Sequence, residues 1–481
     1  MNTSPLTLLR DFDDRLSPMV VKELRHGLRT RMFTSVLTVI QLCMILIVGS
    51  GVLGVDMEVI SNLFWGFALA ALLVALPLRG FGTLSGEFGS GTMDMLTLTS
   101  IPSLRIVFGK WSALFSQSLL LAVSLLPYMV ARYHFGGVEI FQEGIALLVT
   151  VLASGLATAA FVAFSSQRSV ILRLFLGVGL LFSLIPVTAF VFVMINESGG
   201  DRALSEFLAL RMWEQVGIVG GLLLVSCYGV YTLLALGASR IAPISENHST
   251  GKRLIHLVVL GLLAAVGTGL CFHPDDEAFF WVYVPSVVLT FVVGVDVLTE
   301  EMPRFPSVVQ GLAKWGKPGR LLYPGWASGV WFYSLLGALN LGMLTLYVGQ
   351  RSWSDMEESF LWVAGMLLSA VVPVCLRINK TNRFANWWVV NIGLGVAGVL
   401  LSIFVNISDA KEGSFLGCIT PVTGLFAATN HYQFEDEILV TTALVGLGWL
   451  VAALVLVSRE NKVYALLETE ALELDDRSKS S

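Results

Sequence analysis

One aspartate inside an apolar run is the first residue of this sequence that could carry chemistry. Asp296 lies near the end of the stretch Ala278–Leu298, about one helical turn before Glu300. If that stretch crosses a membrane, its carboxylate is a functional hypothesis by default, because it can relay a proton or a cation. Near the end of a span, however, water reaches the acid and its cost falls. Asp296 is therefore either a relay residue or a structural acid at a helix end.

Other arrangements with chemical potential are incomplete. The stretch Gly311–Pro318 is one residue from a phosphate-binding loop, but Pro318 stands where a Ser or Thr hydroxyl must hold magnesium. The 5 cysteines and 6 histidines show no spacing typical of a metal site or a disulfide framework. The sequence thus predicts no catalytic, cofactor-binding or metal-binding residue, and we expect a protein that is not an enzyme.

The composition predicts what must position these residues. Of 481 residues, 55% are hydrophobic and only 14% are charged, too few to cover a soluble surface of ordinary polarity. Apolar stretches long enough to cross a hydrocarbon core of about 30 Å recur along the chain. Twelve such spans are predicted: Thr34–Leu53, Val59–Leu78, Ile106–Val130, Ile140–Phe164, Val170–Ile195, Trp213–Ser239, Leu254–Cys271, Ala278–Leu298, Ala327–Val348, Phe360–Leu376, Ala385–Val405 and Ile438–Val457. The expected fold is an all-α polytopic membrane protein.

Basic residues alternate along the chain between the two sides of the predicted membrane. All but five of the 30 lysines and arginines fall on the side that holds both termini. The five on the other side are Arg132, Arg202, Arg211, Arg351 and Lys411. Because basic loops stay cytoplasmic, both termini are predicted to be inside. The acidic end of the chain makes nucleic acid an unexpected partner.

The spacing of the spans predicts two six-helix halves. Residues 1–33 form a cytoplasmic leader, 34–239 the first half, 240–253 a polar linker, 254–457 the second half and 458–481 an acidic cytoplasmic tail. In each half a long inner segment separates the second span from the third, and a long outer segment precedes the last. The second of these outer segments contains an apolar stretch, 415–428, that is too short to span and could dip back into the membrane.

The leader predicts an amphipathic helix before the first span. Ser17 and Pro18 suit a helix start, and Val20, Leu24 and Leu28 recur every four residues on one face. Basic and polar residues, Lys22, Glu23, Arg25 and Arg29 among them, fill the rest. This pattern is typical of a helix lying in the headgroup plane of the lipid bilayer. The alternative is a leader that acts only as a positive-inside signal.

The inner segment between the second and third spans, residues 80–105, carries the most specific pattern. It begins glycine-rich, which predicts flexibility, and Thr92 can then cap a short helix that ends at Pro102. Leu96 would present an apolar face of that helix to the cytoplasm, and Lys110 would anchor the next span. An exposed apolar face on a cytosolic loop favours a protein partner.

Here the chain resembles the permease subunits of type-2 ABC transporters. The matching residues between the second and third spans are Glu87, Gly91, Thr92, Leu96, Pro102, Gly109 and Lys110. The leader, with Pro18, Lys22, Glu23, Leu24 and Arg25, resembles the interfacial helix of bacterial members. The resemblance implies that residues 80–105 hold a coupling helix, which docks on a separate ATP-binding subunit. The second half resembles the family only in the number of its helices.

The resemblance predicts an exporter permease in the bacterial inner membrane, driven by ATP that a partner chain hydrolyses. Two other interpretations stay open: an ion-coupled secondary transporter that uses Asp296, and a membrane scaffold or assembly factor without transport activity. Most members of the family have six spans per chain. Hence one chain is either an internal pseudo-dimer or half of a homodimer, and its substrate stays open.

Overall fold

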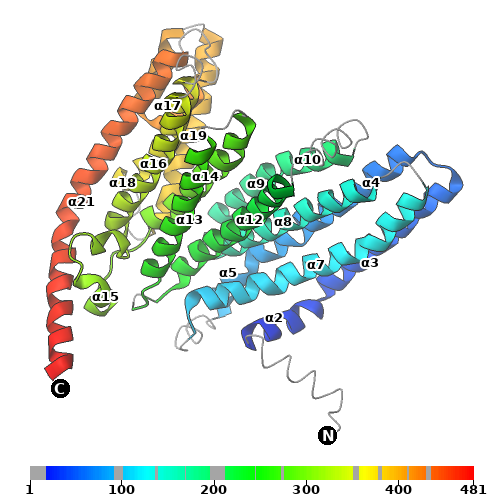
Figure 1. Ribbon diagram of the computed structural model, residues 1–481, viewed down its shortest axis with the longest axis horizontal. Helices are drawn as coiled ribbons and strands as arrows, with labels where there is room; N and C mark the ends of the chain where they lie inside the picture. Colours follow the sequence, from blue (N-terminus) through cyan, green and yellow to red (C-terminus); the bar gives the residue numbers. More distant parts are fainter. Residues whose placement is uncertain are drawn as a thin grey trace. The chain divides into compact units, whose positions relative to one another are not determined.

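The computed structural model describes residues 18–90, 101–135, 139–167, 169–195, 212–243, 245–271, 276–349, 357–376, 382–408, 411–428 and 435–480. All regular secondary structure in these ranges is helical (Figure 1). Twelve of the helices are long and apolar enough to cross a membrane. The prediction of an all-α polytopic membrane protein is confirmed. The chain divides into two compact units, Met1–Ile241 and Ala242–Ser481, each described here by itself.

The first unit contains six candidate spans and a short helix before them. Its elements are α2 (Pro18–Leu28), α3 (Arg31–Ser50), η1 (Gly51–Leu53), α4 (Met57–Leu69), η2 (Ala70–Ala75), η3 (Pro77–Gly82), α5 (Thr83–Ser90), α7 (Ser103–Phe135), α8 (Ile140–Phe164), α9 (Val170–Ser183), α10 (Ile185–Ile195) and α12 (Met212–Ile241). The fifth span is divided at Leu184, because Pro186 has no N–H with which to continue the helical ladder.

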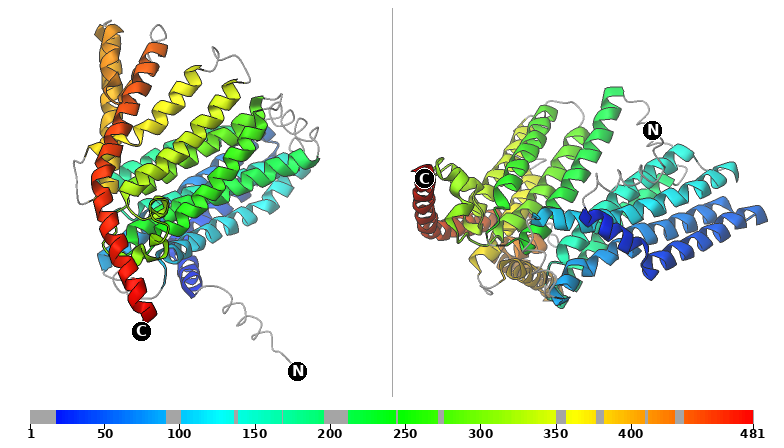
Figure 2. Two further views of the ribbon diagram at one scale, coloured as in Figure 1. Left: turned by 60° about the vertical axis from the view of Figure 1, so that its left-hand side comes forward. Right: turned by 90° about the horizontal axis from the view of Figure 1, so that it is seen from below.

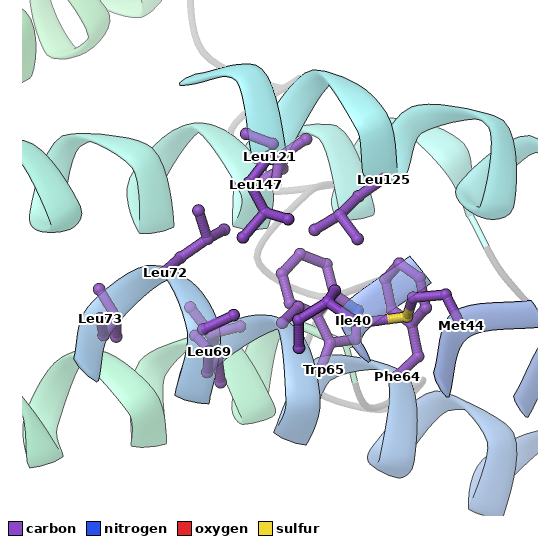
Figure 3. Packing of buried hydrophobic residues seen from close by; sticks show 14 of the residues in the cluster. Ile40, Met44, Phe64, Trp65, Leu69, Leu72, Leu73, Leu121, Leu125 and Leu147 are labelled. Carbon is purple, nitrogen blue, oxygen red and sulfur yellow. The ribbon is translucent and has the colours of Figure 1, made fainter. Parts of the chain in front are cut away.

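Large apolar side chains of four helices form the core of the first unit. Met44 of α3, Phe64 and Trp65 of α4, Leu125 of α7 and Leu147 of α8 converge there (Figure 3). Many apolar side chains on the outer faces of these helices are exposed instead. A soluble protein would not leave so much apolar surface uncovered, whereas lipid tails cover it in a membrane.

The second span continues further into the inner segment than its apolar run predicts. A π-helical turn, η2, leads into the 3-10 helix η3, which begins at Pro77, and then into α5. The glycine-rich stretch up to Ser90 is therefore helical, not the flexible loop expected from its composition. One reason is close packing, since a Cβ at Gly80 would lie 3.0 Å from the Cβ of Phe161 on α8. The glycine lets the two backbones approach each other.

The second unit contains the other six candidate spans. Its elements are α13 (Ser249–Leu270), α14 (Asp276–Leu298), η4 (Pro306–Val308), α15 (Gln310–Ala313), η5 (Gly319–Leu322), α16 (Trp326–Gly349), α17 (Glu357–Ser369), α18 (Val372–Cys375), α19 (Arg383–Ser408), η7 (Lys411–Ile419), α20 (Pro421–Ala428) and α21 (Glu435–Ser480). The stretch Gly311–Pro318, which is one residue from a phosphate-binding loop, contains most of the single turn α15 and a turn at Gly316, where φ is 57°.

Two polar stretches of the sequence belong to helices. The stretch expected as a linker at 240–253 is helical at both ends, because α12 continues to Ile241 and α13 begins at Ser249. The acidic residues after Val457 continue the last span as one helix of 46 residues, α21, which Figures 1 and 2 show reaching the C-terminus. Arg320 donates to Glu468 of α21 at 2.8 and 2.5 Å. The inner loop of the second unit is thus attached to this helix.

The short apolar stretch at 415–428 forms a helical hairpin, η7 followed by α20. The indole of Trp449 on α21 donates to the carbonyl of Ile419 at the tip of this hairpin, at 3.1 Å. Trp449 lies 14 residues after Glu435, where α21 begins. At 1.5 Å per residue the tip therefore reaches about 20 Å along the last span. The hairpin packs against both α19 and α21.

Candidate functional site

A buried lysine joins three elements of the first unit at the predicted cytoplasmic side. Lys110, in the second turn of α7, is only 5% exposed. Its Nζ lies 2.5 Å from Oε1 of Glu87 on α5 and 3.5 Å from Oε1 of Glu23 on α2. A buried ammonium needs such partners, because an unpaired charge away from water is costly. The structure therefore brings together one residue of the leader and two residues of the pattern around the inner segment.

The leader helix packs against α7. Val20 and Leu24 are half-buried, whereas Leu28 is 37% exposed and Lys22 and Arg25 are exposed. Part of the apolar face is thus covered by protein. The two helices approach closely at Gly27, which has no side chain. A Cβ at this position would lie 2.3 Å from the side-chain amide of Gln117 on α7. A larger residue at this position would push α2 away from α7.

A second polar contact holds the end of the leader. Arg79, in η3, donates through Nη2 to the hydroxyl of Thr30 at 2.8 Å and through Nη1 to the side-chain oxygen of Gln117 on α7. Its guanidinium also lies 5.9 Å from the ring centre of Phe33. Arg79 and Lys110 thus connect the same three parts of the chain, namely the leader, the end of the second span and the start of the third.

The middle of the predicted coupling helix is outside the described residues. Gly91, Thr92 and Leu96 all fall there. Pro102 is described: it is exposed, directly precedes α7, and its carbonyl accepts from the N–H of Arg105 at 2.9 Å. The structure accordingly shows how the segment begins, at α5, and how it ends, at α7, and the Glu87–Lys110 pair joins these two ends.

Asp296 lies in a buried ionic cluster of the second unit. Its carboxylate lies 2.7 Å from Nζ of Lys252 on α13, and both side chains are at most 4% exposed. Lys252 also lies 2.6 Å from Glu300, and Arg253 lies 2.5 Å from the same carboxylate. The cluster contains two acids and two bases, so its formal charges balance. A balanced, buried cluster is the arrangement expected of structural acids.

Glu300 is the centre of this cluster. It accepts from the hydroxyl of Ser249 at 2.9 Å and from the N–H of Gly325 at 3.0 Å. Burial alone would raise the pKa of Glu300, but the charges of Arg253 and Lys252 outweigh burial and hold it below the usual carboxyl range. Glu300 is therefore ionised at neutral pH and binds the inner loop to α13.

Arg253 extends the cluster to the start of α16. It donates to the carbonyls of Leu321 and Gly325, at 2.9 and 3.1 Å, and to the hydroxyl of Ser328 at 2.8 Å. The loop that precedes α16 thus closes around a fully buried guanidinium. Hydrogen bonds to a charged donor are among the stronger polar contacts in proteins. The inner loop of the second unit is consequently fixed from α13 as well as from α21.

The first unit holds a further buried ion pair that the sequence did not point to. Arg132, near the end of α7, lies 2.7 Å from Glu143 in the first turn of α8, and both are at most 3% exposed. Trp65 donates to the same carboxylate at 3.3 Å, and Arg132 donates to Ser61 at 2.5 Å. The ring centre of Phe64 lies 4.4 Å from the guanidinium. These contacts join α4, α7 and α8 on the predicted outer side.

The sequence did contain a signal for the cluster around Glu300. Ser249, Lys252, Arg253 and His256 recur at spacings of three and four residues, which places them on one face of a helix. Asp296 and Glu300 are also four residues apart. Polar residues placed at helical spacing beside an apolar run indicate a buried polar face. Hydropathy alone interprets the same residues as a linker.

The described residues contain no group of three or more His, Cys, Asp or Glu that could hold a metal ion. The five cysteines all lie in the described residues and form no disulfide with one another. No protein-family model, curated protein or solved structure matched the chain. The geometry of these clusters, together with the motif resemblance, therefore carries the functional argument.

Proposed function

We propose that the chain is the transmembrane permease subunit of an ABC-type exporter in a bacterial inner membrane. In this proposal a separate ATP-binding subunit docks on the inner segment between the second and third spans, and both termini are cytoplasmic. ATP hydrolysis on that partner drives substrate across the membrane. The chain itself supplies the pathway and the docking helix.

The observation that carries this proposal is the lysine pair at the base of the inner segment. Lys110 binds Glu87 at one end of the segment and belongs to α7 at its other end, and it also contacts Glu23 of the leader. A docking helix transmits force only if both of its ends are attached to the spans that must move. The Lys110 contacts provide that attachment, and they involve the residues on which the resemblance rests.

The division of the chain supports an internal pseudo-dimer. Each compact unit contains six candidate spans, which is the number found in one chain of most family members. Each unit also pairs an acid at or just after the end of its second span with a buried lysine: Glu87 with Lys110 at 2.5 Å, and Glu300 with Lys252 at 2.6 Å. Lys110 lies on α7, the third span of its unit, whereas Lys252 lies on α13, the first span of its unit. The two halves therefore share the acid–lysine pairing but not the position of the lysine. One chain would then supply both halves of a pathway.

The ion-coupled alternative draws less support from the geometry. Asp296 is buried and in contact with Lys252, and the same lysine also contacts Glu300. A relay acid must exchange protons with water or with a further relay group, whereas the Asp296 carboxylate is only 2% exposed and lies 2.7 Å from the Lys252 ammonium. We therefore assign Asp296 a structural part in the inner end of the second unit.

Replacing Leu96 with aspartate tests the proposal, because it places a charge in the apolar docking contact. We expect normal membrane insertion, loss of the co-purifying ATP-binding subunit and loss of substrate-stimulated ATP hydrolysis. Leu312→Asp is the matched control, since this residue lies in the inner loop of the second unit, which lacks the motif. Retention of an active ATP-binding subunit by the Leu96→Asp variant would refute the docking assignment. A function that survives deletion of residues 92–100 would favour a scaffold.

A further inference from the structure

Arg173 is a buried cation without an anionic partner among the described residues. It lies in the first turn of α9 and is 9% exposed. Its Nε and Nη1 atoms are buried and have no hydrogen-bond partner in the described part of the chain. The other deeply buried bases of the first unit differ, because Lys110 and Arg132 each contact a carboxylate. Arg173 therefore has unused donor capacity in a place where water has little access.

The surroundings of Arg173 position its guanidinium without neutralising it. The guanidinium carbon lies 4.9 Å from the ring centre of Phe81, on η3. The face of an aromatic ring attracts a cation, but it does not accept strong hydrogen bonds from the N–H groups of that cation. On the other side, Gly177 lets α9 approach Phe81 closely, since a Cβ there would lie 3.3 Å from the ring. The guanidinium is consequently held between α9 and the end of the second span.

The start of α9 adds a second feature that favours an anion. Ser169 caps this helix through its hydroxyl, which accepts from the N–H of Leu172 at 3.4 Å, and Val170 begins the helix. A helix N-terminus carries partial positive charge, and side chains in helices lean toward the N-terminus. The Arg173 charge and the partial charge of the first turn of α9 are thus both positive at this end of the helix. Leaving this buried charge unpaired would be costly, so a bound anion would relieve a real energetic penalty.

The face of α9 next to this site is apolar and exposed. Val170, Ile171, Leu174 and Phe175 are all more than half exposed. In a membrane these side chains face lipid tails. Arg173 lies three residues after the start of the helix, which is about 4.5 Å along its axis, and so it lies at the level of lipid headgroups. An anion that is covalently attached to acyl chains fits both surfaces at once.

We infer that Arg173 and the N-terminus of α9 form a binding site for the phosphate group of a membrane phospholipid. The guanidinium donates N–H groups to phosphate oxygens once the side chains that cover Nε and Nη1 move aside, and the acyl chains lie along the exposed face of α9. The chemistry shared with free inorganic phosphate is the phosphate itself. The lipid-facing position of α9 favours the headgroup as its source.

The site is tested on the full chain, purified in detergent and depleted of lipid. Thermal unfolding is followed while phosphatidylglycerol, diacylglycerol with the same acyl chains, or inorganic phosphate is added, and native mass spectrometry measures the retained lipid. We expect phosphatidylglycerol to raise the melting temperature of the wild type and diacylglycerol to leave it unchanged. The Arg173→Gln variant should lose this response. Arg31→Gln, an exposed arginine at the start of α3, is the control that should keep it.

The Arg173→Lys variant keeps the test decisive if Arg173→Gln fails to fold. Lysine retains the charge but lacks the bidentate fork, so the apparent affinity for phosphatidylglycerol should fall about tenfold. An equal response of wild type, Arg173→Gln and Arg173→Lys to phosphatidylglycerol would overturn the site. A full response to inorganic phosphate alone would overturn the lipid source and leave a phosphate site. A response to phosphatidylglycerol alone supports the inference as stated.

Discussion

Replacing Lys110 with methionine should release the leader and α5 from α7. Methionine is similar in length but carries no charge, so Glu87 and Glu23 lose their common partner while the packing volume is kept. Breaking a buried ion pair by removing one partner costs about 3–5 kcal/mol. Here Glu87 and Glu23 are 21% and 20% exposed and can regain part of their hydration. We therefore expect about 2 kcal/mol, or about 30-fold in the equilibrium between docked and undocked leader.

Limited trypsin digestion of the detergent-solubilised chain measures this equilibrium. Arg25 on α2 and Arg29 directly after it are exposed, but a helix packed on α7 is a poor substrate, so cleavage follows the undocked population. The Lys110→Met variant should be cut about 30-fold faster than wild type at these residues. Arg105 is exposed and lies on α7, the helix that contains Lys110, so the Arg105→Met variant should be cut within α2 at the wild-type rate.

A double-mutant cycle assigns the effect to individual pairs. The 2.5 Å contact with Glu87 should show a larger coupling to Lys110 than the 3.5 Å contact with Glu23. Unchanged cleavage of the Lys110→Met variant would show that the ion pairs do not hold the leader. A coupling to Glu23 larger than that to Glu87 would show that the described geometry is not the one in solution.

Three further predictions concern topology and the buried clusters. Cysteines placed at 275–277 and 355–358 should react with impermeant reagents from outside, and those at 314–320 only from inside; the reverse labelling would invert the assigned orientation. Glu300→Gln should lower the free energy of unfolding by about 3–5 kcal/mol, because Lys252 and Arg253 stay buried without their carboxylate partner. The Glu301→Gln variant, at an exposed neighbouring position, should match wild type in melting curves recorded in detergent. The pKa of Glu300 lies below its unfolded value, so this contribution is complete above the usual carboxyl range and is lost only as the pH falls through the lower, folded-state pKa; a Glu300→Gln difference that grows between about pH 6 and pH 8 would contradict the assignment. Arg132→Met and Glu143→Gln should each destabilise the first unit strongly, and the double variant should lose less than the two single losses together; additive losses would exclude a direct pair.

The spans could be predicted because one physical requirement dominates them. A helix that crosses the hydrocarbon core must be apolar over about 20 residues, and that length is visible in the sequence alone. Ile140–Phe164 and Val170–Ile195 were predicted with the bounds that the structure shows. The ends of other helices depend on side-chain partners instead. α13 begins at Ser249, and its N-terminal end contains Lys252 and Arg253, which are neutralised by Asp296 and Glu300. A hydropathy profile cannot predict this, because it does not include such ion pairs.

The candidate site was predictable in part. The motif identified Glu87, Lys110 and Glu23 as residues of interest, but nothing in the sequence states that they meet. The contact between Glu23 and Lys110 depends on the close packing of α2 on α7 at Gly27, which is a tertiary feature. The partner of Arg132 was missed for the same reason: Glu143 lies across the outer turn, and only the folded bundle places both side chains in one buried contact.

The most direct test of the proposed function is a photo-cross-link from the docking helix. A photoreactive amino acid at position 96, introduced into the full chain in its native membrane, should capture a polypeptide that binds ATP and contains a phosphate-binding loop. The same probe at position 312 should capture this polypeptide more weakly or not at all. Capture at position 96 of an ATP-binding subunit is the predicted result. If functional chains give no ATP-binding adduct at that position, the chain is not the permease of an ABC exporter.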